Sequence, residues 1–400
     1  MPTTLVFVNE NDYYLHSFTP PIPMTSSTVR RWAWIHKWSS LVCTLFMLLL
    51  CITGLPLIYH HDIVHLLGND AAAPRMAPGT PRAGVDEVIA AGRAMYPDKI
   101  MMYMSQEVDE PDIWNLTLGD NPTDPNYKPI AVDARSARVL AEPAFEGGAF
   151  MSLMFHLHVD LYAGVPGKLF LGLMGLLLLV AIVSGVVLYA PFMRKLDFGT
   201  VRRDRTRRLK WLDLHNLLGI VTLVWALVVG ATGMINTWAE LLLNVWQTTE
   251  VAEMLRPYQG MAPAPATASV QLAVARAEAA EPGMKVAFVA FPGTPFSSTH
   301  HYGVFMRGDT ALTARLYKPV LVDAQSGQVT DRRSLPWYLV ALLMSQPLHF
   351  GDYGGAPMQF LWALFDVATM IMLGSGLYLW ARRARAAKAA AQAGASLEAA

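Results

Sequence analysis

The chain has 400 residues, with 31 basic and 31 acidic side chains, so its formal net charge at neutral pH is zero. Hydrophobic residues make up 53% of the chain and charged residues only 16%. This balance excludes a purely soluble enzyme of this length and favours an integral membrane protein.

The chain begins with a polar stretch that is interrupted by prolines. It has neither the basic n-region nor the short apolar h-region of a cleaved signal peptide. We interpret residues 1–30 as a cytoplasmic tail, in which Met24 is an alternative start. The alanine-rich residues 384–400 are interpreted as a similar tail. We expect no chemistry from either tail.

Four apolar stretches are long enough to cross a bilayer. They run over residues 39–59, 169–192, 212–236 and 359–380. At ~1.5 Å of rise per residue, a helix of about 20 residues crosses the ~30 Å hydrocarbon core. The sequence therefore predicts an α-helical membrane protein with four transmembrane helices.

Basic residues gather at one end of each apolar stretch. They are Arg30, Arg31, Lys37, Arg194, Lys195, Arg202, Arg203, Arg205, Arg207, Arg208, Lys210, Arg382, Arg383, Arg385 and Lys388. By the positive-inside rule these ends are cytoplasmic, so we interpret the basic loop as a topology signal and not as a nucleic-acid site. Residues 63–168 and 239–358 then lie in the periplasm. The prediction is a multi-pass protein of the bacterial inner membrane with both termini cytoplasmic.

The two periplasmic segments have the same pattern of elements. Residues 85–97 and 269–282 have helical periodicity and stop at a proline. Short β-prone runs follow and end in "IAVDARSARVL" and "VLVDAQSGQVT", whose centres suit hairpin turns. We therefore predict one small periplasmic α+β domain in each segment.

An internal repeat organises the chain. One set of positions recurs at a constant displacement: Trp32, His36, Thr53 and Gly54 match Trp211, His215, Thr232 and Gly233. A second set does the same: His158, Tyr162, Gly164, Pro166, Ser184 and Gly185 match His349, Tyr353, Gly355, Pro357, Ser375 and Gly376. The hairpin segments "YKPIAVDARSARV" and "YKPVLVDAQSGQV" also correspond. We infer two tandem repeats.

The spans and the repeat set the domain boundaries. We assign residues 1–30 to a cytoplasmic tail, 31–62 to the first span, 63–144 to a first periplasmic domain, 145–193 to an interfacial helix and the second span, 194–210 to a basic cytoplasmic loop, 211–238 to the third span, 239–333 to a second periplasmic domain, 334–383 to an interfacial helix and the fourth span, and 384–400 to a tail.

Several short motifs occur in a fixed order within each repeat. An "IH" at a basic span entrance, a "TG" near the far end of that span, a "VDAQSGQV" hairpin and a second span ending in "SGVVLY" or "SGLYLW" carry the pattern. From about Arg30 to Arg383 the chain resembles the PepSY-associated transmembrane-helix proteins. That family includes iron-regulated inner-membrane proteins and ferric-siderophore reductases, so the resemblance implies a function in iron acquisition with PepSY-like periplasmic domains.

The chain departs from the family pattern in two ways. The first hairpin, "VDARSARV", lacks the usual glycine, which is a local detail of the turn. No flavin-reductase domain is expected in the sequence, which leaves the electron donor open among a quinol, a flavoprotein and a ferredoxin.

Four matched histidines are the candidate site. Both repeats have the same orientation, so a two-fold axis along the membrane normal would relate them. This axis would place His36 opposite His215 on the cytoplasmic side and His158 opposite His349 on the periplasmic side. Two facing imidazoles can supply both axial ligands of a haem iron. Because the chain has no Cys-x-x-Cys-His motif, we expect two non-covalent b-type haems, each with bis-histidine ligation.

Side chains near the cytoplasmic pair are further candidates. Trp32 and Trp211 lie one helical turn from their histidines, where they could stack on a haem or lie at the lipid headgroup level. Arg31 and Arg208 could pair with haem propionates, as could Lys37 and Lys210, although topology alone also explains basic residues there.

The other histidines have no ligating counterpart in the repeat. His156 lies beside His158, but its equivalent is Pro347, which cannot bind iron, so symmetry favours His158. The rest are His60, His61, His65, His300 and His301. We expect them to have surface roles, with contact to an iron complex or to a third metal as the open alternative.

Two functional hypotheses follow. The first is a dihaem b-type oxidoreductase that passes electrons across the inner membrane, reduces a periplasmic ferric siderophore and releases ferrous iron. This outer-sphere reaction needs no acid, base or nucleophile, so no catalytic residue is assigned. The second is a PepSY-type periplasmic binding or regulatory protein without redox activity. The sequence leaves open which siderophore is used, which donor supplies electrons and which oligomer forms.

Overall fold

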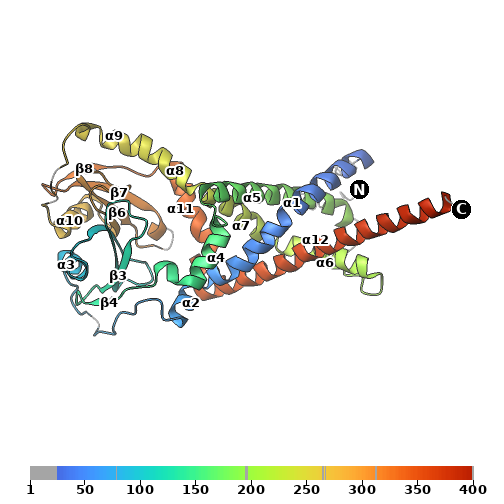
Figure 1. Ribbon diagram of the computed structural model, residues 1–400, viewed down its shortest axis with the longest axis horizontal. Helices are drawn as coiled ribbons and strands as arrows, with labels where there is room; N and C mark the ends of the chain where they lie inside the picture. Colours follow the sequence, from blue (N-terminus) through green and yellow to red (C-terminus); the bar gives the residue numbers. More distant parts are fainter. Residues whose placement is uncertain are drawn as a thin grey trace, which may run out of the picture.

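The computed structural model describes residues 25–77, 79–193, 197–263, 265, 267–310 and 313–398. Most of the expected N-terminal tail, including Met24, lies outside these residues, as do Arg194 and Lys195 of the basic loop. A bundle of helices forms one end of the molecule and a β-sheet domain forms the other (Figure 1). The first described helix begins, and the last one ends, at the end of the bundle that is far from the sheet (Figure 1).

Seven helices build the bundle within the described residues. They are α1 (Ser26–Ile58), α4 (Ala149–Val159), α5 (Val165–Met193), α6 (Arg207–Val221), α7 (Leu223–Thr237), α11 (Trp337–Phe350) and α12 (Gly355–Glu398). A short helix, α2 (His60–Leu66), follows α1 at the sheet end.

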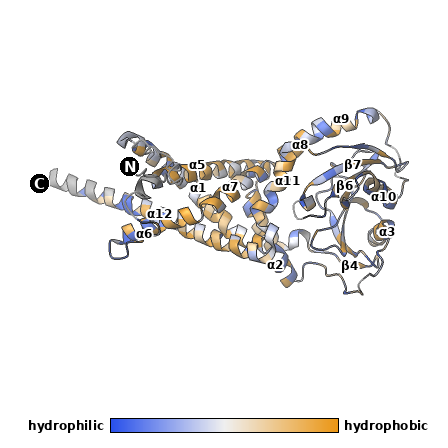
Figure 2. Ribbon diagram, turned by 180° about the vertical axis from the view of Figure 1, so that it is seen from behind, coloured by the Kyte–Doolittle hydropathy of each residue, from blue (hydrophilic) through white to orange (hydrophobic). Residues whose placement is uncertain are grey.

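Three of these helices, α1, α5 and α12, are apolar and long enough to cross a membrane. Large apolar side chains such as Leu45 and Val224 are 68% and 74% exposed, which a membrane protein tolerates because lipid covers them. The middle of the bundle is hydrophobic and its far end is hydrophilic (Figure 2). The chain is therefore a membrane protein with at least three candidate spans.

The third expected span, within residues 211–238, is broken. Residues 212–236 form parts of two helices, α6 and α7, which are bent by 65° relative to each other and are long and apolar enough to cross a membrane only together. The break lies at Thr222, whose hydroxyl donates to the carbonyl of Leu218, 2.8 Å away and one turn earlier. Such back-bonding competes with the helical ladder and bends helices. A hydropathy pattern alone could not locate this bend.

Within the part of the chain that the structure describes, the β-strands form one antiparallel sheet of eight strands. The strands are β1 (Ile100–Ser105), β2 (Ile113–Gly119), β3 (Lys128–Asp133), β4 (Val139–Ala141), β5 (Lys285–Ala290), β6 (His301–Arg307), β7 (Tyr317–Asp323) and β8 (Val329–Arg332). Their order is β4-β3-β2-β1-β5-β6-β7-β8. The β1–β5 pair, with Tyr103 opposite Ala290, joins the two segments. The structure thus differs from the prediction of two separate small domains, because their sheets are continuous.

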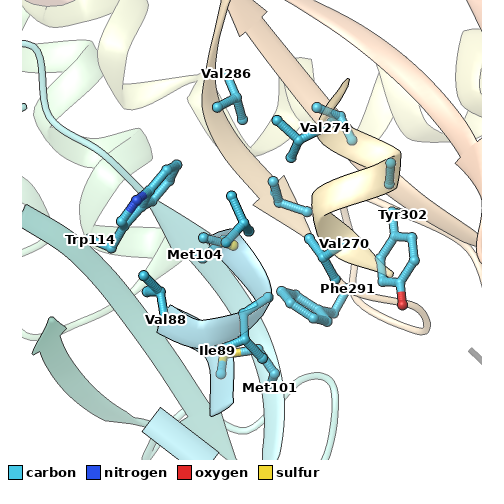
Figure 3. Packing of buried hydrophobic residues seen from close by; sticks show 14 of the residues in the cluster. Val88, Ile89, Met101, Met104, Trp114, Val270, Val274, Val286, Phe291 and Tyr302 are labelled. Atoms are coloured by element: carbon cyan, nitrogen blue, oxygen red, sulfur yellow. The ribbon is translucent and has the colours of Figure 1, made fainter. Parts of the chain in front are cut away.

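One face of the sheet is covered by two helices, α3 (Val85–Met95) and α10 (Val270–Ala280). Alternate strand residues such as Leu116 and Val304 are completely buried against them, as the two-residue period of a strand requires. Val88 of α3 and Val270 of α10 belong to this shared core (Figure 3). The helices expected over residues 85–97 and 269–282 are therefore present.

The opposite face of the sheet packs toward the bundle. Trp246, at the end of α8 (Ala239–Trp246), lies against Phe305 of β6 with 6.3 Å between ring centroids. Leu339 and Leu342 of α11 belong to the same cluster. A short helix, α9 (Ala252–Met254), follows α8. This cluster connects the sheet to the helix that carries His349.

The two expected hairpin turns are present. In the β3–β4 turn, Asp133 accepts hydrogen bonds from the backbone of Arg135 and Ser136. Asp323 makes the same kind of contacts in the β7–β8 turn. The turn residue with positive φ is Gly327 in the second hairpin (φ 70°) but Ala137 in the first (φ 54°). The missing glycine of the sequence therefore corresponds to a non-glycine residue in the left-handed region.

Candidate functional site

The structure brings the four matched histidines together as two pairs. His36 on α1 and His215 on α6 have ring centroids 6.5 Å apart. His158 on α4 and His349 on α11 have centroids 6.1 Å apart. We call the first the loop-side pair, because it lies toward the basic loop, and the second the sheet-side pair. Each pair combines one residue from each half of the chain.

The tautomer of His36 is set by its neighbours on α5. Its Nδ1 lies 2.9 Å from the carbonyl oxygen of Ala181 and 3.2 Å from the hydroxyl of Ser184. A carbonyl oxygen can only accept a hydrogen bond, so Nδ1 must carry the proton. The neutral ring then has its lone pair on Nε2, which is the nitrogen available to a metal.

His215 makes the same contacts with α12. Its Nδ1 lies 3.1 Å from the carbonyl oxygen of Met372 and 2.9 Å from the hydroxyl of Ser375. Nδ1 is again the donor, and Nε2 again has the lone pair. Both members of the loop-side pair are therefore fixed in the same tautomer.

The sheet-side pair uses threonines in place of serines. His349 Nδ1 lies 3.0 Å from the carbonyl oxygen of Val229 and 3.4 Å from the hydroxyl of Thr232. His158 Nδ1 lies 3.0 Å from the hydroxyl of Thr53, and that hydroxyl donates to the carbonyl of Leu49 at 2.8 Å. Because the threonine proton is already used, the histidine is the donor here too.

Each imidazole also lies against a glycine of the neighbouring helix. A methyl group added at the glycine would come close to Cε1 of the ring. The distances are 2.8 Å for Gly233 and His349, 3.1 Å for Gly54 and His158, 3.2 Å for Gly185 and His36, and 3.4 Å for Gly376 and His215. The Ser-Gly and Thr-Gly dipeptides of the repeat therefore act as seats, in which the glycine admits the ring and the hydroxyl orients it.

A cavity of about 530 Å³ lies beside the loop-side pair, between α1, α5, α6 and α12. Both His36 and His215 contribute to its walls, which are otherwise mostly apolar. Three basic residues, Lys37, Arg208 and Arg383, also line it. This volume is in the usual range for cofactor sites, and the basic rim suits a ligand with acidic groups.

The arginines and tryptophans that the sequence suggested for the loop-side level do not all lie at the cavity. Arg208 lines the cavity, whereas Arg31, Trp32 and Trp211 are not among the described residues that line it. Trp211 packs on Tyr378 of α12, with ring centroids 5.7 Å apart. Of the basic residues that the sequence suggested for this level, Arg208 and Lys37 line the same cavity as the two histidines.

His156 has both ring nitrogens engaged. Its Nε2 lies 3.2 Å from a carboxylate oxygen of Glu146 and its Nδ1 lies 3.3 Å from one of Asp160. A ring with two carboxylate partners has no free lone pair for a metal. This contact set agrees with the preference for His158.

The remaining histidines differ in their burial. His61 and His65 are exposed, His60 is half-buried, and His65 pairs with Asp70 at 2.9 Å. His300 and His301 are only 5% and 0% exposed, so the expectation of surface roles is wrong for these two. They are buried because β6 begins at His301 within the sheet, which a count of unmatched histidines could not reveal.

Sequence reasoning missed two features of the site. It did not assign the hydroxyls of Thr53, Thr232, Ser184 and Ser375 as partners of the histidines. It also treated Arg383 as a topology signal only. The four hydroxyl residues could have been found in the sequence, because each of them directly precedes a glycine that the repeat conserves between its halves.

Among the described residues, no group of three or more His, Cys, Asp and Glu side chains could hold a metal ion. A site with two protein ligands suits a metal whose other ligands come from a cofactor. Two metal–nitrogen bonds of about 2.0 Å and two imidazole rings of about 1.1 Å radius would set axial histidines about 6 Å apart between centroids. Both observed pairs have this spacing.

Fold and site together define a helical membrane protein with one antiparallel sheet domain and two half-buried histidine pairs inside the helix bundle. The PepSY-associated TM region family matches residues 33–383, and the chain belongs to this family. The resemblance inferred from the short motifs is thus confirmed. The chain is also similar to an uncharacterised protein of Pseudomonas aeruginosa, with 28% identity over 273 residues. That match covers 58% of this chain and 64% of the relative.

Proposed function

We propose that the chain is a dihaem b-type oxidoreductase of the bacterial inner membrane. In this proposal α6 and α7 together form a fourth span, the basic loop is cytoplasmic and the sheet domain is periplasmic, in agreement with the positive-inside rule. The protein would carry electrons to a ferric siderophore and release ferrous iron. The observation that supports it most is the pair of imidazoles, each with Nδ1 engaged, that recurs at two levels of the bundle.

The chain's own residues would hold each haem in a defined way. His36 and His215 would be the axial ligands at the loop-side level, and His158 and His349 at the sheet-side level. Hydrogen bonds from Nδ1 to carbonyl and hydroxyl oxygens fix ring orientation and raise the basicity of Nε2. At the loop-side level Arg208, Lys37 and Arg383 are the candidates to pair with propionates, since all three line the same cavity as the two rings.

A bis-histidine haem supplies one-electron chemistry with no open coordination position. The residues around it therefore have to bind, orient and exclude water, and they need not act as acid, base or nucleophile. A siderophore holds ferric iron through hard oxygen ligands and ferrous iron much more weakly, so electron delivery alone is a route to release. The donor is a quinol, a flavoprotein or a ferredoxin on the cytoplasmic side.

A second candidate is a binding or regulatory protein whose sheet domain recognises a periplasmic partner. The continuous eight-stranded sheet favours it, because this sheet is large and has two edge strands, β4 and β8. The binding hypothesis, however, does not explain why four imidazoles inside the bundle are fixed in the same tautomer. We therefore keep the redox proposal first.

The test is a rapid-mixing experiment on the purified, chemically reduced protein. A ferric siderophore should reoxidise the wild type, and the His349→Ala variant should react far more slowly while its other haem stays reducible. The His65→Ala variant is the matched control, because this histidine is exposed and pairs only with Asp70 at the surface. If no ferric chelate reoxidises the wild type, the reductase proposal is wrong.

A further inference from the structure

Asp366 is the one acidic or basic residue in the central apolar parts of the bundle helices, taken as residues 39–58 of α1, 169–193 of α5, 223–237 of α7 and 357–381 of α12. It is only 5% exposed. Ionisable residues inside a membrane are costly and are usually functional. The histidine pairs do not account for it.

Three buried polar atoms of α7 and α12 lack hydrogen-bond partners in the described part of the chain. They are Asp366 Oδ2, Thr369 Oγ1 and Trp225 Nε1. Asp366 and Thr369 lie one turn apart on the same face of α12. Trp225 extends from α7, and its ring lies 6.1 Å from that of Phe365, the neighbour of Asp366. Three buried orphan atoms from two packed helices indicate a site that takes a small polar ligand, since buried polar groups are otherwise paired.

The site lies between the two histidine levels. The Cys51 thiol of α1 faces the carboxyl group of Asp366. Cys51 is close in sequence to Thr53, which holds His158. Ser375, which holds His215, is about 14 Å further along α12 at ~1.5 Å per residue. Asp366 is therefore nearer to the sheet-side pair.

This site is present in only one half of the molecule. By the repeat correspondence, Gly175 takes the place of Asp366 in the first half and Phe46 takes the place of Trp225. A feature of the duplicated histidine scaffold would occur twice. The function of these residues must therefore be one that only the second half of the bundle carries out.

The groups around Asp366 leave it without a compensating charge. On α1 only Cys51 faces it, and α7 has no titratable residue. The titratable residues of α6, including His215 and Asp213, lie at the loop-side end, and Tyr353 after α11 directs its hydroxyl to Met344. A carboxylate in such surroundings is stable only if a positive charge is added nearby, and otherwise binds a proton.

We propose that Asp366, Thr369 and Trp225 form an intramembrane proton site, with a bound water, that responds to the redox state of the sheet-side centre. This inference rests on the proposed function. When the donor adds one electron at that level, one positive charge is removed, and Asp366 Oδ2 binds one proton from solvent. When the electron leaves to the ferric chelate, Asp366 releases that proton. Trp225 Nε1 and Thr369 Oγ1 hold the water that carries it.

The test is reduced-minus-oxidised infrared spectroscopy of the full chain in lipid vesicles, with dithionite as reductant. The wild type should gain the C=O band of a protonated carboxyl on reduction, and Asp366→Asn should lose that band. The exposed Asp109→Asn is the matched control and should keep it. A Trp225→Phe variant, which keeps an aromatic ring but lacks Nε1, should gain a weaker carboxyl band on reduction than the wild type does.

A second readout separates this inference from the proposed function. The midpoint potential of the sheet-side haem should fall with rising pH in the wild type and become independent of pH in Asp366→Asn. A visible haem spectrum without the reduction-dependent carboxyl band overturns the proton site alone. The absence of any haem spectrum overturns the proposed function, and with it the redox coupling.

Discussion

The two halves of the bundle hold their histidines alike but differ between the histidine levels. At all four positions, an imidazole lies against a glycine and donates from Nδ1 to the helix that carries that glycine. Between these levels, α1 runs without a break from Ser26 to Ile58, whereas α6 and α7 are bent at Thr222. The histidine contacts are therefore the shared requirement of the two halves, and the intervening helices are free to diverge.

The sheet domain shows the same contrast. At one end of the β2–β3 pair Ile113 lies opposite Asp133, and at the same end of the β6–β7 pair His301 lies opposite Asp323. Equivalent positions of one backbone thus hold an apolar residue in the first half and a titratable residue in the second. Fold and register are common to both halves, while the chemistry at single positions is not.

The largest expected effect is the loss of a haem from a single histidine change. His36→Ala and His215→Ala should each remove the loop-side haem and leave the other, because each deletes one axial ligand of the same pair. His158→Ala should do the same at the sheet-side level. Pyridine haemochrome analysis of each variant measures the ratio of haem to chain. Two retained low-spin haems in both loop-side variants would contradict the assignment.

A smaller, graded effect is expected at the glycine seats. Gly233→Ala places a methyl group 2.8 Å from His349, which requires a shift, whereas Gly376→Ala leaves 3.4 Å to His215, an ordinary contact. The sheet-side haem affinity of Gly233→Ala should fall about tenfold or more, as for other changes around metal ligands. Haem titration of the depleted protein measures both variants. Equal losses would mean that the glycines do not seat the rings as described.

The sheet should lose stability in acid because of His301. Burial, opposed by the Asp323 carboxylate, lowers the pKa of His301 from 6.5 to about 4. The unfolded chain therefore binds this proton first, and the free energy of unfolding should fall by about 3 kcal/mol as the pH drops from 6.5 to 4. Hydrogen exchange of β6 amides in the wild type and in His301→Ile measures this. A pH dependence that survives in the variant would assign it to another group.

The smallest effect concerns the two hairpin turns. Ala137→Gly should stabilise the sheet domain by about 1 kcal/mol, because a non-glycine residue at φ 54° is strained. The opposite change, Gly327→Ala, should destabilise it, since the new methyl would also lie 2.8 Å from Leu272. Thermal unfolding followed by tryptophan fluorescence tests both. A loss of stability in Ala137→Gly would show that the turn is not strained there.

Most of the features that could be predicted from the sequence depend on local sequence patterns. Helical periodicity located α3 and α10, and the Asp-centred motifs located the hairpins, because both depend on residues close together in sequence. The repeat identified all four histidines and the adjacent dipeptides, including Thr53-Gly54. Two-fold symmetry then suggested which rings lie opposite each other.

Longer-range features could not be predicted in this way. The β1–β5 pair joins segments that are far apart in the chain, and the sequence of neither strand indicates that the two would pair. The bend at Thr222 occurs within a uniformly apolar stretch. The burial of His300 and His301 and the unpaired Oδ2 atom of Asp366 depend on packing across several elements.

The most direct test of the central claim is the haem content of the purified full-length protein. The account predicts two non-covalent b-type haems per chain, with a sharp low-spin Soret band that shifts on dithionite reduction and pigment that acid-acetone extracts. A protein that is expressed with ample haem, folded and yet colourless would contradict the account, because the two histidine pairs would then have no cofactor to hold.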